Sequence, residues 1–222
     1  MAQRSIVRPA HEALSDIRDA ERRWDGWNSD AVKAVNALVN VLLQHHAAQQ
    51  PAAWHPSLLF LFPDLVAKFE AANLHSARDA LARLRTVVDK MAQHVSNIDA
   101  AADKLATLVP LVSQAAGTQP FAFGTLEMYA RLARAACETY KKAMTVREEH
   151  ISQLDATIRA LEGASAAPLL PPGSLDSDAQ LVKILTWQDS PGLKDARLDH
   201  PDHTTILTLA DFDDLLLLES QV

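Results

Sequence analysis

A heptad pattern of apolar and small residues over residues 76–108 constrains this chain more than any other feature. Its members alternate in steps of four and three: Ala77, Leu81, Leu84, Val88, Met91, Val95, Ile98, Ala102 and Leu105. That spacing places them on one face of a helix, with charged and polar residues on the other. At about 1.5 Å per residue such a helix is roughly 50 Å long. Its apolar face must pack against other long helices.

A second heptad pattern runs over residues 10–49. Its members are Leu14, Ile17, Glu21, Trp24, Asn28, Ala31, Val35, Leu38 and Leu42. Glu21 and Asn28 are polar on an otherwise apolar seam. Such residues set helix register or partner choice at some cost in stability, or they are hydrated near a helix end. Trp24 and Trp27 share a face, where they either pack in a core or anchor a partner.

A third long helix is predicted from Thr125, its N-cap, to Glu162, with Gly163 as its C-terminal stop. Two successive four-residue steps at Tyr140 form a stutter that locally relaxes supercoiling, and Arg147 lies on the seam near it. The seam comprises Leu126, Tyr129, Ala133, Ala136, Tyr140, Met144, Arg147, Ile151, Leu154, Ile158 and Leu161.

The densest apolar cluster lies between the first two of these helices. It comprises Leu58, Leu59, Phe60, Leu61, Phe62, Leu65 and Phe69. Pro63 breaks the chain, Asp64 favours a new start for a helix of two to three turns, and Ser76 with Asp79 resembles a capping box for the central helix. We expect this cluster to cap one end of the bundle. If it is exposed, it is a docking surface instead.

The chain divides into four parts by composition. These are a flexible lead over residues 1–9, a long-helix bundle over residues 10–163, a Pro/Ala/Ser linker over residues 164–176 and short helices over residues 177–222. Pro110 is expected to bend or stop the central helix. The short helices are predicted from Asp178 to Gln188 and over the acidic, leucine-rich residues 205–219. Because the last one is too short to fold alone, it must pack on the bundle or on another chain.

Composition excludes several classes of protein. The 222 residues are rich in alanine, only 5% are aromatic and only six are glycine, which favours helices over a β-sandwich or a dinucleotide-binding domain. A net charge of −7 argues against binding nucleic acid through phosphates. The single cysteine, Cys137, excludes an intrachain disulfide framework. Without a long apolar run or a signal-peptide core, we expect a soluble intracellular protein with no membrane partner.

Recognisable catalytic chemistry is absent from the sequence. The phosphate-loop, dinucleotide, serine-hydrolase and HExxH signatures are missing. The best local metal candidate, DHPDH at residues 199–203, lacks paired downstream ligands. Cys137 has no catalytic histidine placed by a motif, which favours a buried thiol. We therefore expect no enzymatic activity, no cofactor and no metal.

Basic residues follow the third helix and have two interpretations. Arg131, Arg134, Lys141, Lys142 and Arg147 form this series. They are either a solvated face of the helix or a contact for an acidic partner.

Several short stretches resemble one family of proteins. They are FPDL at residues 62–65, LARLRTVVDKMAQHVSNI at residues 81–98, EMYARLARAACETYKKAMTVREEHISQL at residues 127–154, and LVKILTW at residues 181–187 before an acidic leucine-rich tail. In this order, over residues 10–220, they resemble the AIRIM family, also described as casein-kinase-two-substrate-like proteins. The tryptophan-bearing start and LVKILTW are also similar to CINP, the cyclin-dependent-kinase-two-interacting protein. FPDL and the central helix favour AIRIM, whereas the alanine-rich Pro linker departs from the animal pattern.

The resemblance implies a non-catalytic adaptor or assembly subunit. Its partners would be a CINP-like helical subunit and SPATA-class AAA+ ATPases. Such complexes act in large ribosomal subunit maturation and are linked to replisome protein turnover, which implies a cytoplasmic and nuclear location. We expect one heptad seam to pair with the CINP-like subunit, and residues 58–69 or the acidic tail to contact the ATPase.

The residues and the resemblance together predict an all-α, elongated bundle of three long heptad-bearing helices with short C-terminal helices. Candidate partner-binding residues are Trp24, Trp27, Phe60, Phe62, Pro63, Asp64, Leu65, Tyr140, Trp187, Phe212 and Leu215. Two alternatives remain open. The first is a structural homo-oligomeric coiled-coil or tethering protein, and the second is a metal-dependent enzyme that uses the histidine-rich segments.

Overall fold

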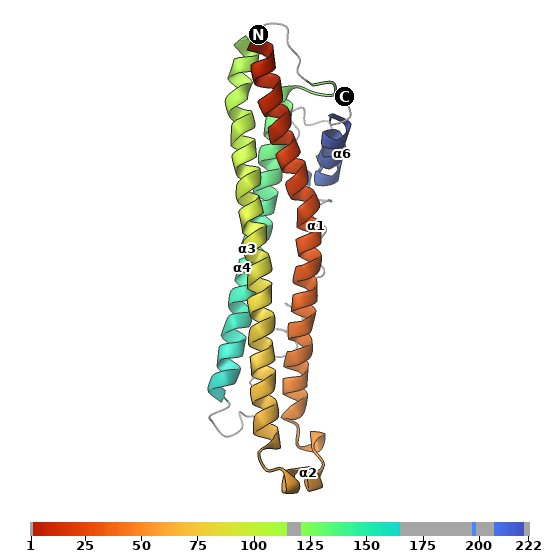
Figure 1. The fold of residues 1–222 in the computed structure, drawn as a ribbon, viewed down its shortest axis with the longest axis vertical. Coiled ribbons are helices and arrows are strands. Elements are labelled where there is room, and N and C mark those ends of the chain that lie inside the picture. Colours follow the sequence, from red (N-terminus) through yellow and green to blue (C-terminus); the bar gives the residue numbers. More distant parts are fainter. Residues whose placement is uncertain (1, 115–120, 165–196, 199–206, 220–222) are drawn as a thin grey trace. The chain divides into compact units, whose positions relative to one another are not determined.

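The computed structural model of this chain is built mainly from helices (Figure 1). It describes residues 2–114, 121–164, 197–198 and 207–219. Three long helices carry most of them: α1 at Ala2–Ala48, α3 at Leu65–Gln114 and α4 at Leu126–Ala164. A 3-10 turn, η1 at Pro51–Ala53, and a short helix, α2 at Pro56–Leu61, connect α1 to α3. The prediction of an all-α helical bundle is confirmed.

The C-terminal helix is shorter than predicted. Two strands, β1 at Arg197–Leu198 and β2 at Leu207–Thr208, pair antiparallel, and α6 at Leu209–Glu219 follows directly. The helix begins at Leu209 because Thr208 and Asp211 cap it reciprocally. The Thr208 hydroxyl accepts from the Asp211 N–H at 3.2 Å, and the Asp211 carboxylate accepts from the Thr208 N–H at 2.7 Å. The linker after residue 164 and the helix predicted from Asp178 to Gln188 lie outside the described residues.

The long helices extend beyond their predicted ends. Helix α1 begins at Ala2, with Pro9 inside it, and α3 begins at Leu65 instead of Ser76. Residues 66–75 contain no glycine or proline, so propagation overrides the capping pattern at Ser76. Helix α3 also continues past Pro110 to Gln114. A proline removes only one helical hydrogen bond, and close to a helix end few further turns depend on it.

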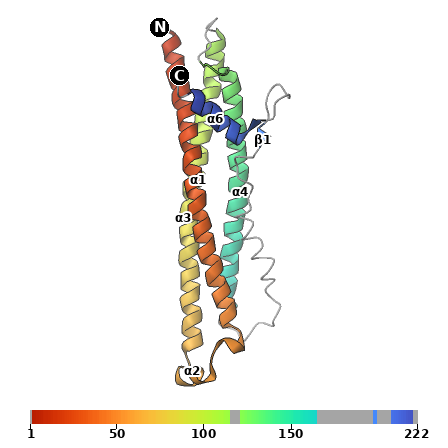
Figure 2. The same ribbon diagram turned by 90° about the vertical axis from the view of Figure 1, so that its right-hand side faces the viewer.

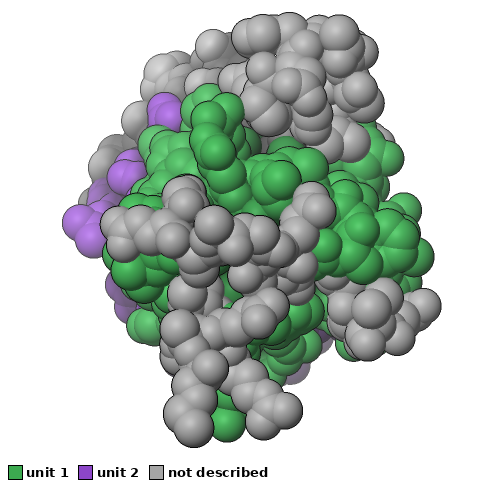
Figure 3. All heavy atoms as spheres, turned by 90° about the horizontal axis from the view of Figure 1, so that it is seen from above, with its two compact units in different colours: residues 1–27, 90–145, 190–222 green, residues 28–89, 146–189 purple. Residues whose placement is uncertain are grey.

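The chain gathers into two compact units, each containing part of every long helix (Figure 3). Unit 1 comprises residues 1–27, 90–145 and 190–222, and unit 2 comprises residues 28–89 and 146–189. Every member of the heptad pattern in residues 76–108 is buried, as predicted. The helices therefore bury their seams within the chain. A seam buried in this way is not free to pair with a CINP-like subunit, and that expectation is corrected.

The two cores differ in composition. In unit 1 the buried side chains are large and partly aromatic, and include Ile17, Trp24, Met91, Ile98, Leu105, Phe121, Tyr129, Leu132, Tyr140 and Phe212. In unit 2 they are aliphatic, and include Val35, Leu38, Leu81, Leu84, Val88, Ile151, Leu154, Ile158 and Leu161. Ion pairs border the aliphatic core, with Arg78 bonded to Glu162 and Arg85 within 3.0 Å of Asp155.

Candidate partner-binding surfaces

Local hydrogen bonds fix the turn that carries α2 in unit 2. The His55 ring accepts from the Ser57 N–H at 3.2 Å and caps the helix, while Pro56 occupies the first helical position, where no N–H is needed. At the other end, the Phe62 N–H donates to the Leu58 carbonyl at 2.8 Å. The Leu65 N–H then donates to the Phe62 carbonyl at 3.0 Å and leads into α3. These bonds give the short helix two defined ends.

Trp54 attaches this turn to the long helices of unit 2. Its indole N–H donates to the Ala48 carbonyl at the end of α1, at 2.7 Å. Its ring packs edge-on against Phe69 of α3, with ring centroids 5.3 Å apart. A half-buried indole is stabilised by an apolar contact and a hydrogen-bond acceptor, and this site provides both. Trp54 therefore joins the turn to both α1 and α3. The sequence interpretation missed this role of Trp54, although a tryptophan followed by a His-Pro-Ser helix start is a readable signal.

The side chains that α2 presents are exposed. None of its six residues, all of which the structure describes, is buried. We define the apolar tip as residues 58–62, whose exposed fractions are 43% for Leu58, 36% for Leu59, 86% for Phe60, 64% for Leu61 and 57% for Phe62. The expectation that these five residues cap the bundle is wrong. The physical reason is that the turn is closed by Trp54 and by backbone bonds, which leaves the tip outside the core.

A buried histidine lies beneath this turn in unit 2. His45, on the last turn of α1, is 4% exposed, and its Nε2 lies 3.2 Å from the Gln49 side-chain nitrogen. Burial lowers the pKa of His45, the neighbouring Glu70 opposes that shift, and His46 adds to it. His45 is therefore neutral near pH 7 and becomes costly to keep buried when it is protonated.

The other predicted partner-binding residues have different surroundings. Pro63 and Asp64 are exposed beside the apolar tip, and Leu65 is half-buried. Trp24 and Tyr140 lie in the core of unit 1, with ring centroids 4.7 Å apart, and Trp27 lies half-buried against His94. Phe212 is fully buried, Leu215 is half-buried, and Trp187 lies outside the described residues. Among the candidate residues that the structure describes, Phe60, Phe62, Pro63 and Asp64 are exposed and close together in the sequence.

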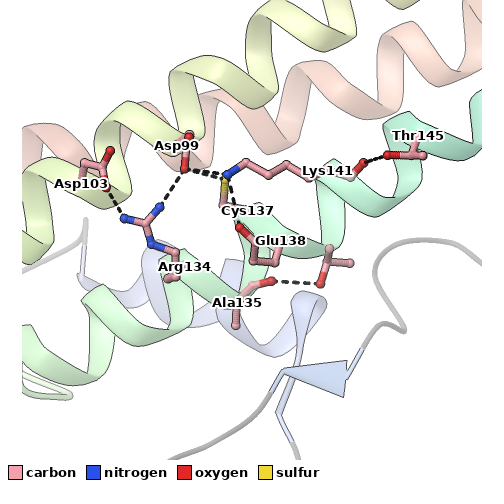
Figure 4. A network of polar contacts seen from close by, with 9 residues as sticks. Asp99, Asp103, Arg134, Ala135, Cys137, Glu138, Lys141 and Thr145 are labelled. Atoms are coloured by element: carbon pink, nitrogen blue, oxygen red, sulfur yellow. Dashed lines mark hydrogen bonds and ion pairs between the residues drawn. The ribbon is translucent and has the colours of Figure 1, made fainter. Parts of the chain in front are cut away.

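The basic series on α4 is largely paired within unit 1 (Figure 4). Arg134 bonds Asp99 at 2.8 Å and also bonds Asp103, while Lys141 bonds Asp99 at 3.1 Å and Glu138 at 3.2 Å. Arg131 pairs with Glu127 one turn earlier. These bonds lower the pKa of Asp99, chiefly through Lys141. Such pairing favours the interpretation of this series as a structural feature of the chain.

Cys137 is part of the same network. Its thiol is fully buried and donates to the Asp99 carboxylate at 3.3 Å. Burial first, and then the adjacent carboxylate, raise the pKa of Cys137 to about 12. A thiol in this setting stays protonated and is a poor nucleophile or metal ligand.

Two polar members of the heptad seams meet in unit 2. Arg147 of α4 donates to the Asn28 side-chain oxygen of α1 at 2.9 Å. Both were singled out in the sequence as polar positions on a seam, and the structure pairs them. Burial lowers the pKa of Arg147 to about 10. A buried hydrogen bond of this kind is geometrically specific, so it fixes which turns of α1 and α4 lie opposite each other.

The described part of the chain was considered for two further features, a metal-binding cluster and a helix that could cross a membrane. Within it, no group of three or more histidine, cysteine, aspartate or glutamate side chains is placed to hold a metal ion. The DHPDH segment lies outside the described residues. Among the described helices, none combines the length and the apolar character that crossing a membrane requires.

Comparison with known proteins does not assign this chain to a family. The chain has no significant match among protein-family models, curated proteins or solved structures.

Proposed function

We propose that this chain is a non-catalytic adaptor subunit that assembles with an AAA+ ATPase. The apolar tip is the observation that supports this proposal. Contiguous exposed apolar surface marks sites of protein interaction. The tip is also held in place by hydrogen bonds and by Trp54. A preorganised anchor loses little conformational entropy when it binds, so a small surface of this kind contributes strongly to affinity.

The sequence resemblance supplies the classes of partner in this proposal. A SPATA-class AAA+ ATPase contacts the apolar tip, which adjoins the FPDL stretch at residues 62–65. A CINP-like helical subunit binds outside the three buried seams. The complex acts in large ribosomal subunit maturation, in the cytoplasm and nucleus, with replisome protein turnover as a second process.

Co-purification with single substitutions tests this proposal. Phe60→Asp places a charge in the most exposed position of the tip without touching the core. Val146→Asp is the matched control, because Val146 is an exposed apolar residue of unit 2 on α4, away from α2. We expect the tagged wild-type chain and the control to recover an AAA+ ATPase and a second helical subunit, and Phe60→Asp to lose the ATPase. Recovery of neither partner by the wild-type chain contradicts the proposal.

A second candidate function, a homo-oligomeric structural protein, is favoured by the same exposed tip. At about 200 Å² per fully exposed large side chain, the five exposed fractions leave about 600 Å² of accessible surface. Two copies in contact would bury about 1,200 Å², the lower limit of stable interfaces. Light scattering on the purified chain distinguishes the two candidates. The adaptor proposal predicts a monomer, and the alternative predicts a dimer that Phe60→Asp dissociates.

A further inference from the structure

The C-terminal helix α6 packs with one apolar face within unit 1, and we call the surface that it covers the groove. Leu209 and Leu216 are 3% exposed, and Phe212 between them is fully buried. Their spacing of three and four residues gives α6 one apolar face. Figures 1 and 2 both show α6 beside α1 and α4, and all these segments belong to unit 1.

The burial pattern of α4 shows where this groove lies. Leu132 is fully buried, although it lies between the seam positions Tyr129 and Ala133 and to one side of both. In unit 2 the buried positions of α4 occur only once in each helical turn: Arg147, Ile151, Leu154, Ile158 and Leu161. The buried stripe of α4 is thus wider in unit 1. A stripe of that width is typical of a helix that contacts a further neighbour in addition to two seam partners.

Helix α6 is too short to be stable on its own. It is 11 residues long, which is below the length at which an isolated helix is stable in water. Its start is fixed by Thr208 and Asp211, and thus by bonds within the C-terminal segment itself. Among the residues of α6 whose burial the structure describes, three apolar side chains are buried. Short helices held by few buried side chains open early in native proteins.

We propose that α6 is a displaceable occupant of this groove, and that an amphipathic helix of a partner subunit replaces it. The chemistry of α6 describes that partner helix: apolar residues at positions i, i+3 and i+7, with exposed acidic residues between them, as at Asp211 and Asp214. Because α6 is joined to the groove through its own chain, its effective concentration there is on the order of millimolar. A partner helix with the same affinity for the groove displaces α6 only when its own concentration exceeds this effective concentration. In this way α6 sets a threshold for assembly. This inference rests on the proposed adaptor function only for the identity of the partner.

A labelled synthetic peptide of residues 207–219 is the probe, and fluorescence anisotropy with full-length chains is the measurement. In the Phe212→Ala chain the resident α6 loses its central contact. We expect the peptide to bind that chain at least tenfold more tightly than the wild-type chain, in which α6 competes. A Leu218→Ala chain is the control, because Leu218 is exposed on α6 and its loss leaves the groove occupied. A peptide carrying the same Phe212→Ala change should bind none of the chains.

Two outcomes would overturn the inference. One is equal affinity of the peptide for the wild-type and Phe212→Ala chains. The other is absence of binding to a Phe212→Ala chain that keeps its wild-type helix content by circular dichroism. Hydrogen exchange on the wild-type chain is an independent measurement if that variant fails to fold. Amides of α6 should exchange faster than those of α1, α3 and α4, and equal rates would mean that α6 opens only on global unfolding. None of these measurements involves the ATPase, so failure here is separable from failure of the proposed function.

Discussion

Arg147 of α4 and Asn28 of α1 are joined by a hydrogen bond of 2.9 Å inside unit 2. Arg147 is 6% exposed, at a seam position that an aliphatic residue would normally occupy. A pair of this kind contributes specificity more than stability, because only one register of the two helices brings the donor to the acceptor. The bond gives a structural reason for the polar residues Asn28 and Arg147 on the seams of α1 and α4.

Replacing Asn28 should destabilise the folded chain. Asn28→Ala removes an acceptor from a buried cation, and bonds to charged groups contribute about 1.5–3 kcal/mol. We expect a decrease of that size in the free energy of unfolding, measured by urea denaturation. Asn40→Ala, at an exposed position on the same helix, is the control and should change little. A similar small effect in both variants would show that the bond contributes nothing measurable.

Mild acid should destabilise the fold through two histidines. Burial lowers the pKa of His45, and burial together with the nearby Arg23 lowers that of His94. A histidine in the unfolded chain has a pKa of about 6.5, so below that pH the unfolded state binds more protons and stability falls. The urea midpoint should decrease between about pH 7.5 and about pH 5.5.

Two variants and one control test the origin of this pH dependence. Each of His45→Gln and His94→Gln should reduce the decrease in midpoint, because each removes one of the responsible groups. His75→Gln is the control and should retain it, since His75 is exposed and does not contribute to the shift of either histidine. Carboxylates whose pKa is lowered, such as Asp99 and Asp211, destabilise the fold only in more acidic solution. An unchanged pH dependence in the double His45→Gln, His94→Gln variant would contradict the assignment.

The thiol of Cys137 should react slowly while the chain is folded. It is fully buried, and its pKa is raised to about 12. With an aromatic disulfide reagent at about pH 8, we expect labelling at least about 100-fold slower than in denaturant, because a buried protonated thiol is a poor nucleophile. Since Cys137 is the only cysteine of the chain, the signal has a single source. Rapid labelling of the native chain would show that the core of unit 1 opens frequently.

The apolar tip should be dispensable for folding. Phe60→Asp changes a side chain that is 86% exposed, so the free energy of unfolding should stay within about 0.5 kcal/mol of wild type. Trp54→Ala removes both the bond to Ala48 and the contact with Phe69, and should lower it by about 1–3 kcal/mol. Urea denaturation of the two variants side by side makes the comparison. A large loss of stability in Phe60→Asp would mean that the tip belongs to the core.

The heptad spacing was sufficient to predict the long helices and the residues they bury. Leu84, Met91 and Ile98 recur every seven residues and therefore lie on one face of the helix. All three are buried in the structure. Helix ends were less predictable. The Ser76–Asp79 pattern satisfies a local capping rule, but helix propagation from Leu65 decides the outcome.

The apolar composition of residues 58–62 indicated the candidate site, but the sequence did not predict whether these residues are exposed. An apolar run such as residues 58–62 looks the same in sequence whether it covers a core or faces solvent. The outcome depends on Trp54, which closes the turn through a bond to Ala48 and a ring contact with Phe69. Likewise, the burial of Phe212 depends on the packing of α6 within unit 1, whose other residues are distant in the sequence. Long-range contacts of this kind leave no local periodic signal.

The affinity of the purified full-length chain for the purified AAA+ ATPase tests the adaptor function most directly. The wild-type chain and the Val146→Asp control should bind with equal dissociation constants, and Phe60→Asp should bind at least tenfold more weakly, as expected for a central anchor residue. Because Phe60→Asp is expected to leave the fold intact, such a loss is attributable to the apolar tip. Equal binding by all three chains, or no binding by the wild-type chain, would contradict the proposed role of the tip.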